Sequence, residues 1–144
     1  MDETTTSQLL NILNSADSLK ALDRYVEEYL PAEKTATYQE YFEGILKQKG
    51  MDKSEVIRAS GIQRNYAYQI LGGIRNPSRD KVIALALAAG MDLRQAQKSL
   101  TLCGTGSLYS RSRRDAILIF CINRGLDVMQ ANELLVEMEE EPLN

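Results

Sequence analysis

Two stop-and-start signals divide the C-terminal half of the chain into short helical segments. Each signal is a glycine that ends one helix, followed by an Asp-x-x-Gln pattern that caps the next: Gly90 with Asp92 and Gln95, and Gly125 with Asp127 and Gln130. A shift of 35 residues superposes the two signals and also places Arg79-Asp80 on Arg114-Asp115. This spacing predicts a duplicated helical hairpin, although glycine stops and aspartate caps are also the default punctuation of unrelated short helices. Both interpretations predict an all-α chain.

Helical periodicity extends through the rest of the chain. Apolar side chains at three- and four-residue spacing predict two N-terminal helices, near residues 7–14 and 17–30, and a further helix from Tyr38 to a stop at Gly50. The run 117–122 alone fits a buried strand as well as a buried helix, and the 35-residue register favours the helix. We therefore expect an N-terminal helical hairpin (1–34), a five-helix core (35–104) and a C-terminal helical hairpin extension (105–144).

The composition narrows the class of protein. Of 144 residues, 44% are hydrophobic and 26% charged, which is average for a globular chain. The longest apolar stretch, 116–122, is far shorter than the roughly 20 residues that span a bilayer, and residues 1–30 lack a secretory signal pattern. We expect a cytoplasmic protein with no membrane association.

The chain contains no histidine and two cysteines, Cys103 and Cys121. A Cys/His metal site is therefore not expected, and both cysteines are interpreted as buried small apolar side chains. The commonest general base and every Ser-His or Cys-His nucleophile are also missing. Carboxylate, lysine or tyrosine chemistry remains open, but we expect a non-enzyme with no metal and no cofactor.

Positive charge is concentrated in the middle of an acidic chain. The net charge is −3, whereas residues 51–81 contain six basic and three acidic side chains, a local excess of three positive charges. An anionic partner responds to such a patch within a Debye length of about 8 Å at physiological salt. Small basic patches are also common on ordinary surfaces, so the excess of positive charge indicates an anionic partner only when a binding motif accompanies it.

Residues 53–71 have the pattern of a helix-turn-helix, in which two short helices cross at a flexible turn and the second presents its polar side to the DNA major groove. Gly61 supplies the turn. The inner face is formed by Ile62, Ala67, Ile70 and Leu71, and the residues left for the outer face are Arg64, Asn65, Tyr66, Tyr68 and Gln69. Arginine reads guanine, and asparagine and glutamine read adenine, while tyrosines contact phosphates or thymine methyls.

At these residues the sequence resembles the lambda-repressor-like helix-turn-helix family, in its xenobiotic-response-element branch. The resemblance covers residues 38–104 and rests on the order of five short helices, on Lys53-Ser-Glu-Val-Ile-Arg-Ala-Ser-Gly61-Ile62, and on Tyr68-Gln69-Ile70-Leu71 followed by Gly72-Gly73 and Arg75-Asn76-Pro77-Ser78. It implies that Arg64, Asn65 and Gln69 face the bases and that Lys53, Arg75, Asn76 and Arg79 contact phosphate. The chemistry of the tyrosine side chain, apart from the resemblance, suggests that Tyr66 and Tyr68 contact bases or backbone.

Two positions depart from the family pattern. The family usually has a small residue where this chain has Ile57 and an aliphatic residue where it has Ala67. If the two side chains touch, exchanging large and small keeps the packed volume nearly constant, and we then expect the changes to compensate. Gln63 is also a weaker N-cap than the Ser, Thr or Asp preferred at the start of a helix.

A second basic cluster consists of Arg111, Arg113 and Arg114. Positive charge at a helix start opposes the helix dipole, so the cluster calls for an anion, a partner or acidic neighbours. The acids near the C-terminus, Glu137 and Glu139 to Glu141, are the simpler explanation.

These observations predict a sequence-specific DNA-binding transcriptional regulator that reads double-stranded DNA with the helix Arg64–Leu71. Members of the family commonly dimerise, so the resemblance admits a homodimer, and the terminal hairpins offer surfaces for a protein partner. The alternative is a protein-interaction adaptor that keeps the repressor-like helical fold without binding DNA, as the acidic total charge and the two flanking hairpins would fit.

Overall fold

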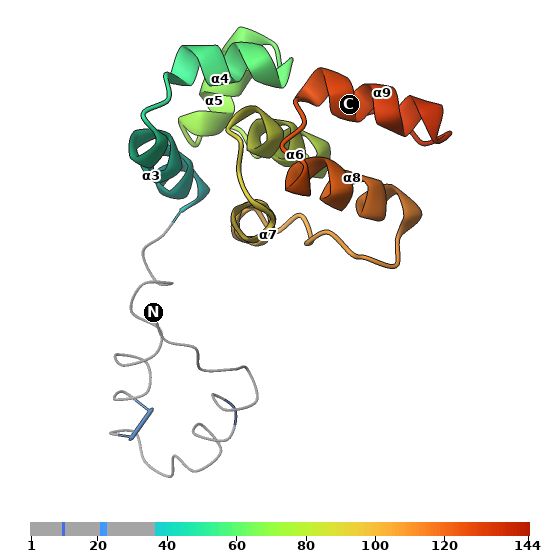
Figure 1. Ribbon diagram of the computed structural model, residues 1–144. Helices are drawn as coiled ribbons and strands as arrows, with labels where there is room; N and C mark the ends of the chain where they lie inside the picture. Colours follow the sequence, from blue (N-terminus) through green and yellow to red (C-terminus); the bar gives the residue numbers. More distant parts are fainter. Residues whose placement is uncertain (1–9, 11–20, 23–36) are drawn as a thin grey trace. The chain divides into compact units, whose positions relative to one another are not determined.

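The computed structural model describes residues 37–144 together with residues 10, 21 and 22 (Figure 1). The chain divides into two units, Met1–Ala36 and Thr37–Asn144. Residues 10, 21 and 22 are helical, and the remainder of the hairpin predicted for 1–34 lies outside the described residues. The second unit is all-helical, with seven helices and no strand among its residues.

The first three helices of this unit are α3 (Tyr38–Lys49), α4 (Lys53–Ser60) and α5 (Arg64–Leu71). Helix α3 begins with a capping box, in which the Thr37 side chain accepts from the Glu40 N–H and the Glu40 side chain accepts from the Thr37 N–H. It ends at Gly50, which adopts a left-handed conformation, as the sequence predicts. The polar stretch before Tyr38 thus ends in a capping box, a helix start signal that was not among the predicted ones.

The next four helices are α6 (Arg79–Ala88), α7 (Leu93–Leu102), α8 (Arg113–Asn123) and α9 (Val128–Glu137). Both predicted Asp-x-x-Gln caps are confirmed, at Asp92 before α7 and at Asp127 before α9. Gly90 and Gly125 both have positive φ angles at the preceding stops. The ambiguous run 117–122 is confirmed as helix.

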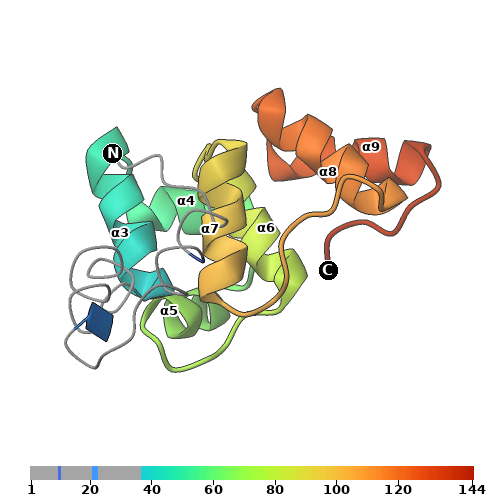
Figure 2. The same cartoon turned by 90° about the horizontal axis from the view of Figure 1, so that it is seen from below.

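Helices α6 and α7 occupy the centre of the unit. Helices α3, α4 and α5 lie on one side of this pair, and α8 and α9 lie on the other, as two views at right angles agree (Figures 1 and 2). Every residue of α6 from Val82 to Leu87 is buried, so this helix presents apolar side chains in all directions. The segment 105–144 shares one hydrophobic core with the helices that precede it.

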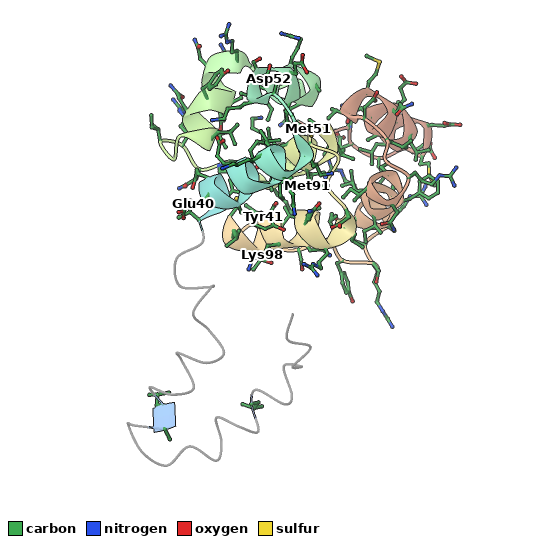
Figure 3. All side chains as sticks on the ribbon, turned by 60° about the vertical axis from the view of Figure 1, so that its left-hand side comes forward. Glu40, Tyr41, Met51, Asp52, Met91 and Lys98 are labelled. Carbon is green, nitrogen blue, oxygen red and sulfur yellow. The ribbon has the colours of Figure 1, made fainter. Side chains whose placement is uncertain are left out.

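Helices α3 and α7 lie side by side, as the labelled Tyr41 of α3 and Lys98 of α7 make visible in Figure 3. Tyr41 is half-buried at this contact. Burial raises the pKa of its hydroxyl, the positive charge of Arg94 opposes the rise, and the negative charge of Asp92 adds to it. The first turn of α7 therefore faces α3.

The two cysteines differ in their surroundings. Cys121 is buried, as predicted, whereas Cys103 is only half-buried at the end of α7. Burial nevertheless raises the pKa of the Cys103 thiol to about 11. Among the described residues, no helix is long and apolar enough to cross a membrane.

Candidate nucleic-acid interface

The turn between α4 and α5 is held by local hydrogen bonds. Gly61 has a φ angle of +75° and ends α4 in the left-handed conformation. The buried Ser60 hydroxyl donates to the Ile57 carbonyl at 2.6 Å and accepts from the Ile62 N–H at 3.2 Å. These hydrogen bonds link the last turn of α4 to the first residue after Gly61 and so restrict the conformations of the turn.

Helix α5 is attached to the core along one face. Ala67, Ile70 and Leu71 are buried on this face, as the sequence predicts. Ile57, the larger of the two residues that depart from the family pattern, is buried in α4, and its counterpart Ala67 is buried in the same core. Both departures therefore lie inside the protein and leave the outer face unaffected.

Gln63 serves as the N-cap of α5 in spite of its low preference for that position. Its side-chain oxygen accepts from the Tyr66 N–H at 2.8 Å. The helix therefore starts at Arg64, which places Arg64 and Asn65 in its first turn.

The exposed face of α5 carries Arg64, Asn65 and Tyr68. The Arg64 guanidinium lies 5.7 Å from the centre of the Tyr68 ring, within the range of a cation–π contact. Gln69 is half-buried. Helix α5 contains no acidic residue, so nothing on the helix itself opposes the approach of a phosphate backbone.

Tyr66 has a different position from its neighbours on α5. The ring is half-buried, with the Arg75 guanidinium and the Lys81 ammonium each 5.4 Å from its centre. It also lines a cavity of about 310 Å³ together with Ser60, Gln63 and Asn132. Tyr66 thus connects α5 to the loop after it and to α6.

The residues expected to contact phosphate differ in their exposure and in whether they already have a partner within the chain. Lys53 forms an ion pair with Glu43 of α3. Arg75 and Asn76 are exposed in the loop after α5, and Arg58, which the sequence argument did not select, is exposed at the end of α4. Among the described residues of this region, Arg58, Arg64 and Arg75 are the exposed arginines.

Arg79 is occupied within the chain. Its guanidinium donates to both carboxylate oxygens of Asp115, at 2.9 and 2.7 Å, and to the carbonyls of Gly106 and Ser107 at 3.1 and 2.9 Å. Every nitrogen of the guanidinium therefore has a protein partner. We assign Arg79 to the fold, and the function proposed below does not use it as a phosphate contact.

Arg114 mirrors this arrangement at the equivalent position of the second hairpin. It donates to both oxygens of Asp80, at 3.0 and 2.9 Å, and to the carbonyls of Glu141 and Pro142. The Arg-Asp dipeptides that the 35-residue shift superposes are thus paired reciprocally, arginine to aspartate in both directions. This relation is what a local twofold axis between the hairpins produces, since such an axis exchanges equivalent residues.

The remaining arginines of the second basic cluster are divided. Arg113 forms an ion pair with Glu140 at 3.2 Å and donates to the Met138 carbonyl at 2.9 Å. Arg111 is exposed. Acidic groups of the chain itself therefore neutralise Arg113 and Arg114. Glu140 is one of the C-terminal acids expected to do so, whereas Asp80 was not expected.

The sequence contained a signal for the reciprocal pairing. Arg79-Asp80 and Arg114-Asp115 recur at the register of the hairpins, and an arginine beside an aspartate at equivalent positions of two packed repeats is able to pair crosswise. The recurrence predicts the alignment of the two hairpins, whereas the crosswise contacts of the charged residues are seen only in the structure.

Comparison with protein-family models gave no match, and the searches of curated proteins and of solved structures found none either. Within the described part of the chain, no group of three or more cysteine, aspartate or glutamate side chains could hold a metal ion.

Proposed function

We propose that this chain is a sequence-specific DNA-binding regulator that inserts α5 into the major groove, with α3–α7 as a repressor-like five-helix domain. The observation that carries the proposal is the division of α5 into two faces. Ala67, Ile70 and Leu71 attach it to the core, and Arg64, Asn65 and Tyr68 remain exposed beyond a fixed turn.

Arg64 and Asn65 are the base-reading residues in this proposal. They lie in the first turn of α5, the part of a recognition helix that approaches the base edges most closely. An arginine matches guanine O6 and N7, and an asparagine matches adenine N6 and N7, each worth about 1–3 kcal/mol of base discrimination. Gln69 is half-buried and takes a secondary position, and Tyr68 supports Arg64 through the cation–π contact.

Arg58 and Arg75 are the main phosphate contacts in this proposal, with Asn76 and Lys53 beside them. The arginines are exposed at the end of α4 and in the loop after α5, and thus flank the helix in sequence. Tyr66 orients Arg75 by stacking. Lys53 contributes less because Glu43 already neutralises its ammonium.

The proposal is tested by selection from a randomised duplex pool of about 30 base pairs at near-physiological salt, which is long enough for two half-sites one helical turn apart. We expect an enriched motif whose affinity falls with salt at a log–log slope of about −0.9 for each neutralised phosphate. Arg64→Ala should lose preference at one base, whereas Arg75→Ala should weaken all sequences about equally.

Arg111→Ala is the matched control, because Arg111 is an exposed arginine outside this face. It should leave both affinity and base preference unchanged. A pool without an enriched motif, combined with no duplex binding at low salt, would contradict DNA recognition.

The protein-interaction adaptor is a second candidate, supported by a separate observation. Phe120, Met129, Val136 and Met138 are exposed on α8 and α9. Phe120 and Met138 line one pocket and Met129 and Val136 line another, and exposed apolar surfaces of this kind are typical of protein-binding sites. Loss of DNA binding in the test above would favour this candidate.

A further inference from the structure

A short segment that follows α9 is held against the helices through its main chain. Residues 141–144 form neither helix nor strand, and Figure 2 shows the chain turning back after α9. The hydrogen bonds to this segment come from four half-buried side chains on three helices: Asp80 and Lys81 of α6, Arg114 of α8 and Asn132 of α9. The segment is therefore held by side chains that contact its main chain, as a bound peptide is held.

Arg114 and Asp80 bind the segment as a pair. The Arg114 guanidinium donates to the main-chain oxygens of Glu141 at 2.9 Å and of Pro142 at 3.2 Å, in addition to both oxygens of Asp80. The Asp80 carboxylate also accepts from the Asn144 N–H at 3.1 Å. The ion pair thus presents a donor and an acceptor side by side, and these match the alternating C=O and N–H groups of an extended main chain.

Asn132 and Lys81 complete this set of contacts. The Asn132 side-chain oxygen accepts from the Leu143 N–H at 2.7 Å, and the Lys81 ammonium donates to the Asn144 main-chain oxygen at 3.1 Å. Hydrogen bonds to the main chain do not depend on the side chains of the bound residues. They therefore provide affinity for an extended segment without selecting its sequence.

Leu143 supplies the side-chain contact. It is half-buried and packs against the core, whereas the other three residues of the segment are exposed. It also lines the cavity of about 310 Å³ beside Tyr66, which Ala84 of α6 and Val128 of α9 line as well. Leu143 thus leaves open space next to it, so a larger apolar side chain at this position has room to bury more surface.

Release of the segment would leave no charge without a partner. Asp80 and Arg114 would keep the two hydrogen bonds that join them. Lys81 and Asn132 are only half-buried and would regain water. The loss of a hydrogen bond is costly mainly where it leaves a buried group unsatisfied, so the main chain of another peptide is able to replace these contacts.

We propose that residues 141–144 occupy a peptide-binding site of their own chain, whose ligand is an extended segment of a partner protein with a large apolar side chain, such as phenylalanine, at the position of Leu143. The chain's own segment then competes with the partner and sets the threshold for its binding. The proposal does not rest on DNA recognition, because none of these contacts uses the exposed residues of α5.

The test uses the full chain without DNA and a fluorescein-labelled, amidated peptide with the sequence of residues 139–144, followed by fluorescence anisotropy. In the wild type the chain's own segment competes at a millimolar effective concentration or above. Leu143→Asp places a charge against the apolar cavity and so displaces that segment. It should lower the peptide dissociation constant at least tenfold, and Leu143→Ser, a milder change, should lower it in the same direction.

Val136→Asp is the matched control for displacement, because Val136 is an exposed apolar residue of α9 that does not line this cavity. It should bind the peptide no better than the wild type. Circular dichroism melting shows that each variant keeps the fold.

Two further changes locate the peptide in the Leu143→Asp chain. Asn132→Ala removes the acceptor for the main chain and should weaken peptide binding several-fold, whereas Asn123→Ala, at an exposed asparagine of α8, should not. A peptide with phenylalanine in place of leucine should bind more tightly than the original peptide, since the cavity has room for the ring.

Three results would overturn the proposal. The first is no binding of the original peptide by the folded Leu143→Asp chain up to about 1 mM, the limit of weak association. The second is equal affinity in the wild type and in Leu143→Asp, or an affinity that Asn132→Ala leaves unchanged, since the peptide would then bind elsewhere. The third is weaker binding of the phenylalanine peptide, which would contradict the role of the cavity.

Discussion

Arg79 and Asp115 join the start of α6 to the start of α8 through two parallel hydrogen bonds of 2.9 and 2.7 Å. Asp115 also accepts from the Tyr109 N–H at 2.9 Å, so the carboxylate fixes the loop that precedes α8. The Asp115 side chain is only 8% exposed. The C-terminal hairpin is therefore attached to the rest of the unit by a shielded ion pair as well as by its apolar core.

We expect Arg79→Met to lower the free energy of unfolding by about 3 kcal/mol, because it leaves the Asp115 carboxylate buried without its cation. Arg114→Met should cost less, about 1–2 kcal/mol, since Asp80 is more exposed and regains water more readily. Urea denaturation of the two variants measures both values. Equal losses would contradict the dependence on burial, and a loss below about 0.5 kcal/mol for Arg79→Met would show that this pair does not stabilise the attachment of the hairpin.

The same ion pairs predict how stability depends on pH. The hydrogen bonds from Arg79 lower the pKa of Asp115 against the opposing effect of burial. Burial would raise the pKa of Asp80, but the hydrogen bonds from Arg114 and from the Asn144 N–H lower it overall. Both carboxylates therefore ionise more readily in the folded chain than in the unfolded chain.

A lowered folded-state pKa stabilises the protein above the unfolded pKa of about 3.9, and this stabilisation is lost as the pH falls through the folded value. We expect the free energy of unfolding to decrease as the pH falls below about 4. The double variant Asp80→Asn/Asp115→Asn should start from a lower stability and decrease less over this range. Denaturant titrations at successive pH values measure the two slopes, and parallel slopes would contradict the assignment.

We expect substitution by alanine to have opposite effects on stability at Gly61 and at Gly44. Gly61 has a φ angle of +75° and no atom within 4 Å of an added Cβ, so Gly61→Ala should cost about 1 kcal/mol through the backbone alone. Gly44 lies within α3 and also has open space around it, so Gly44→Ala should stabilise the fold by about 0.5–1 kcal/mol. Thermal melting distinguishes them. Similar shifts in one direction would mean that the turn does not hold Gly61 in the left-handed conformation in solution.

Most of the helices of the described unit were predictable because their signals are local. A cap such as Asp127 with Gln130 acts within one turn, and a left-handed stop such as Gly125 depends on that residue's own backbone freedom. The inner face of α5 was predictable for the same reason, since Ala67, Ile70 and Leu71 recur at helical spacing. The start of α3 at Tyr38 was predicted from the apolar spacing, although the equally local Thr37–Glu40 box was not identified.

The roles of the arginines were not predictable in this way. Arg79 and Arg75 lie close together in the sequence and both were expected to contact phosphate, yet the first is half-buried and paired with Asp115, whereas the second is exposed and lies over the Tyr66 ring. A charged side chain is long, and its partner is whichever opposite charge the fold brings within reach. For Arg79 that partner is Asp115, which is 36 residues away in the sequence.

The sequence by itself determined the all-helical class, most helix boundaries in the described unit and the register of the two hairpins, because these depend on spacing and on backbone preferences within a few residues. Only the tertiary structure decided which charges are consumed by the fold, which remain on the face of α5, and that Phe120 is left uncovered where Leu85 is buried. Those outcomes depend on how helices pack across distances along the chain that no local pattern encodes.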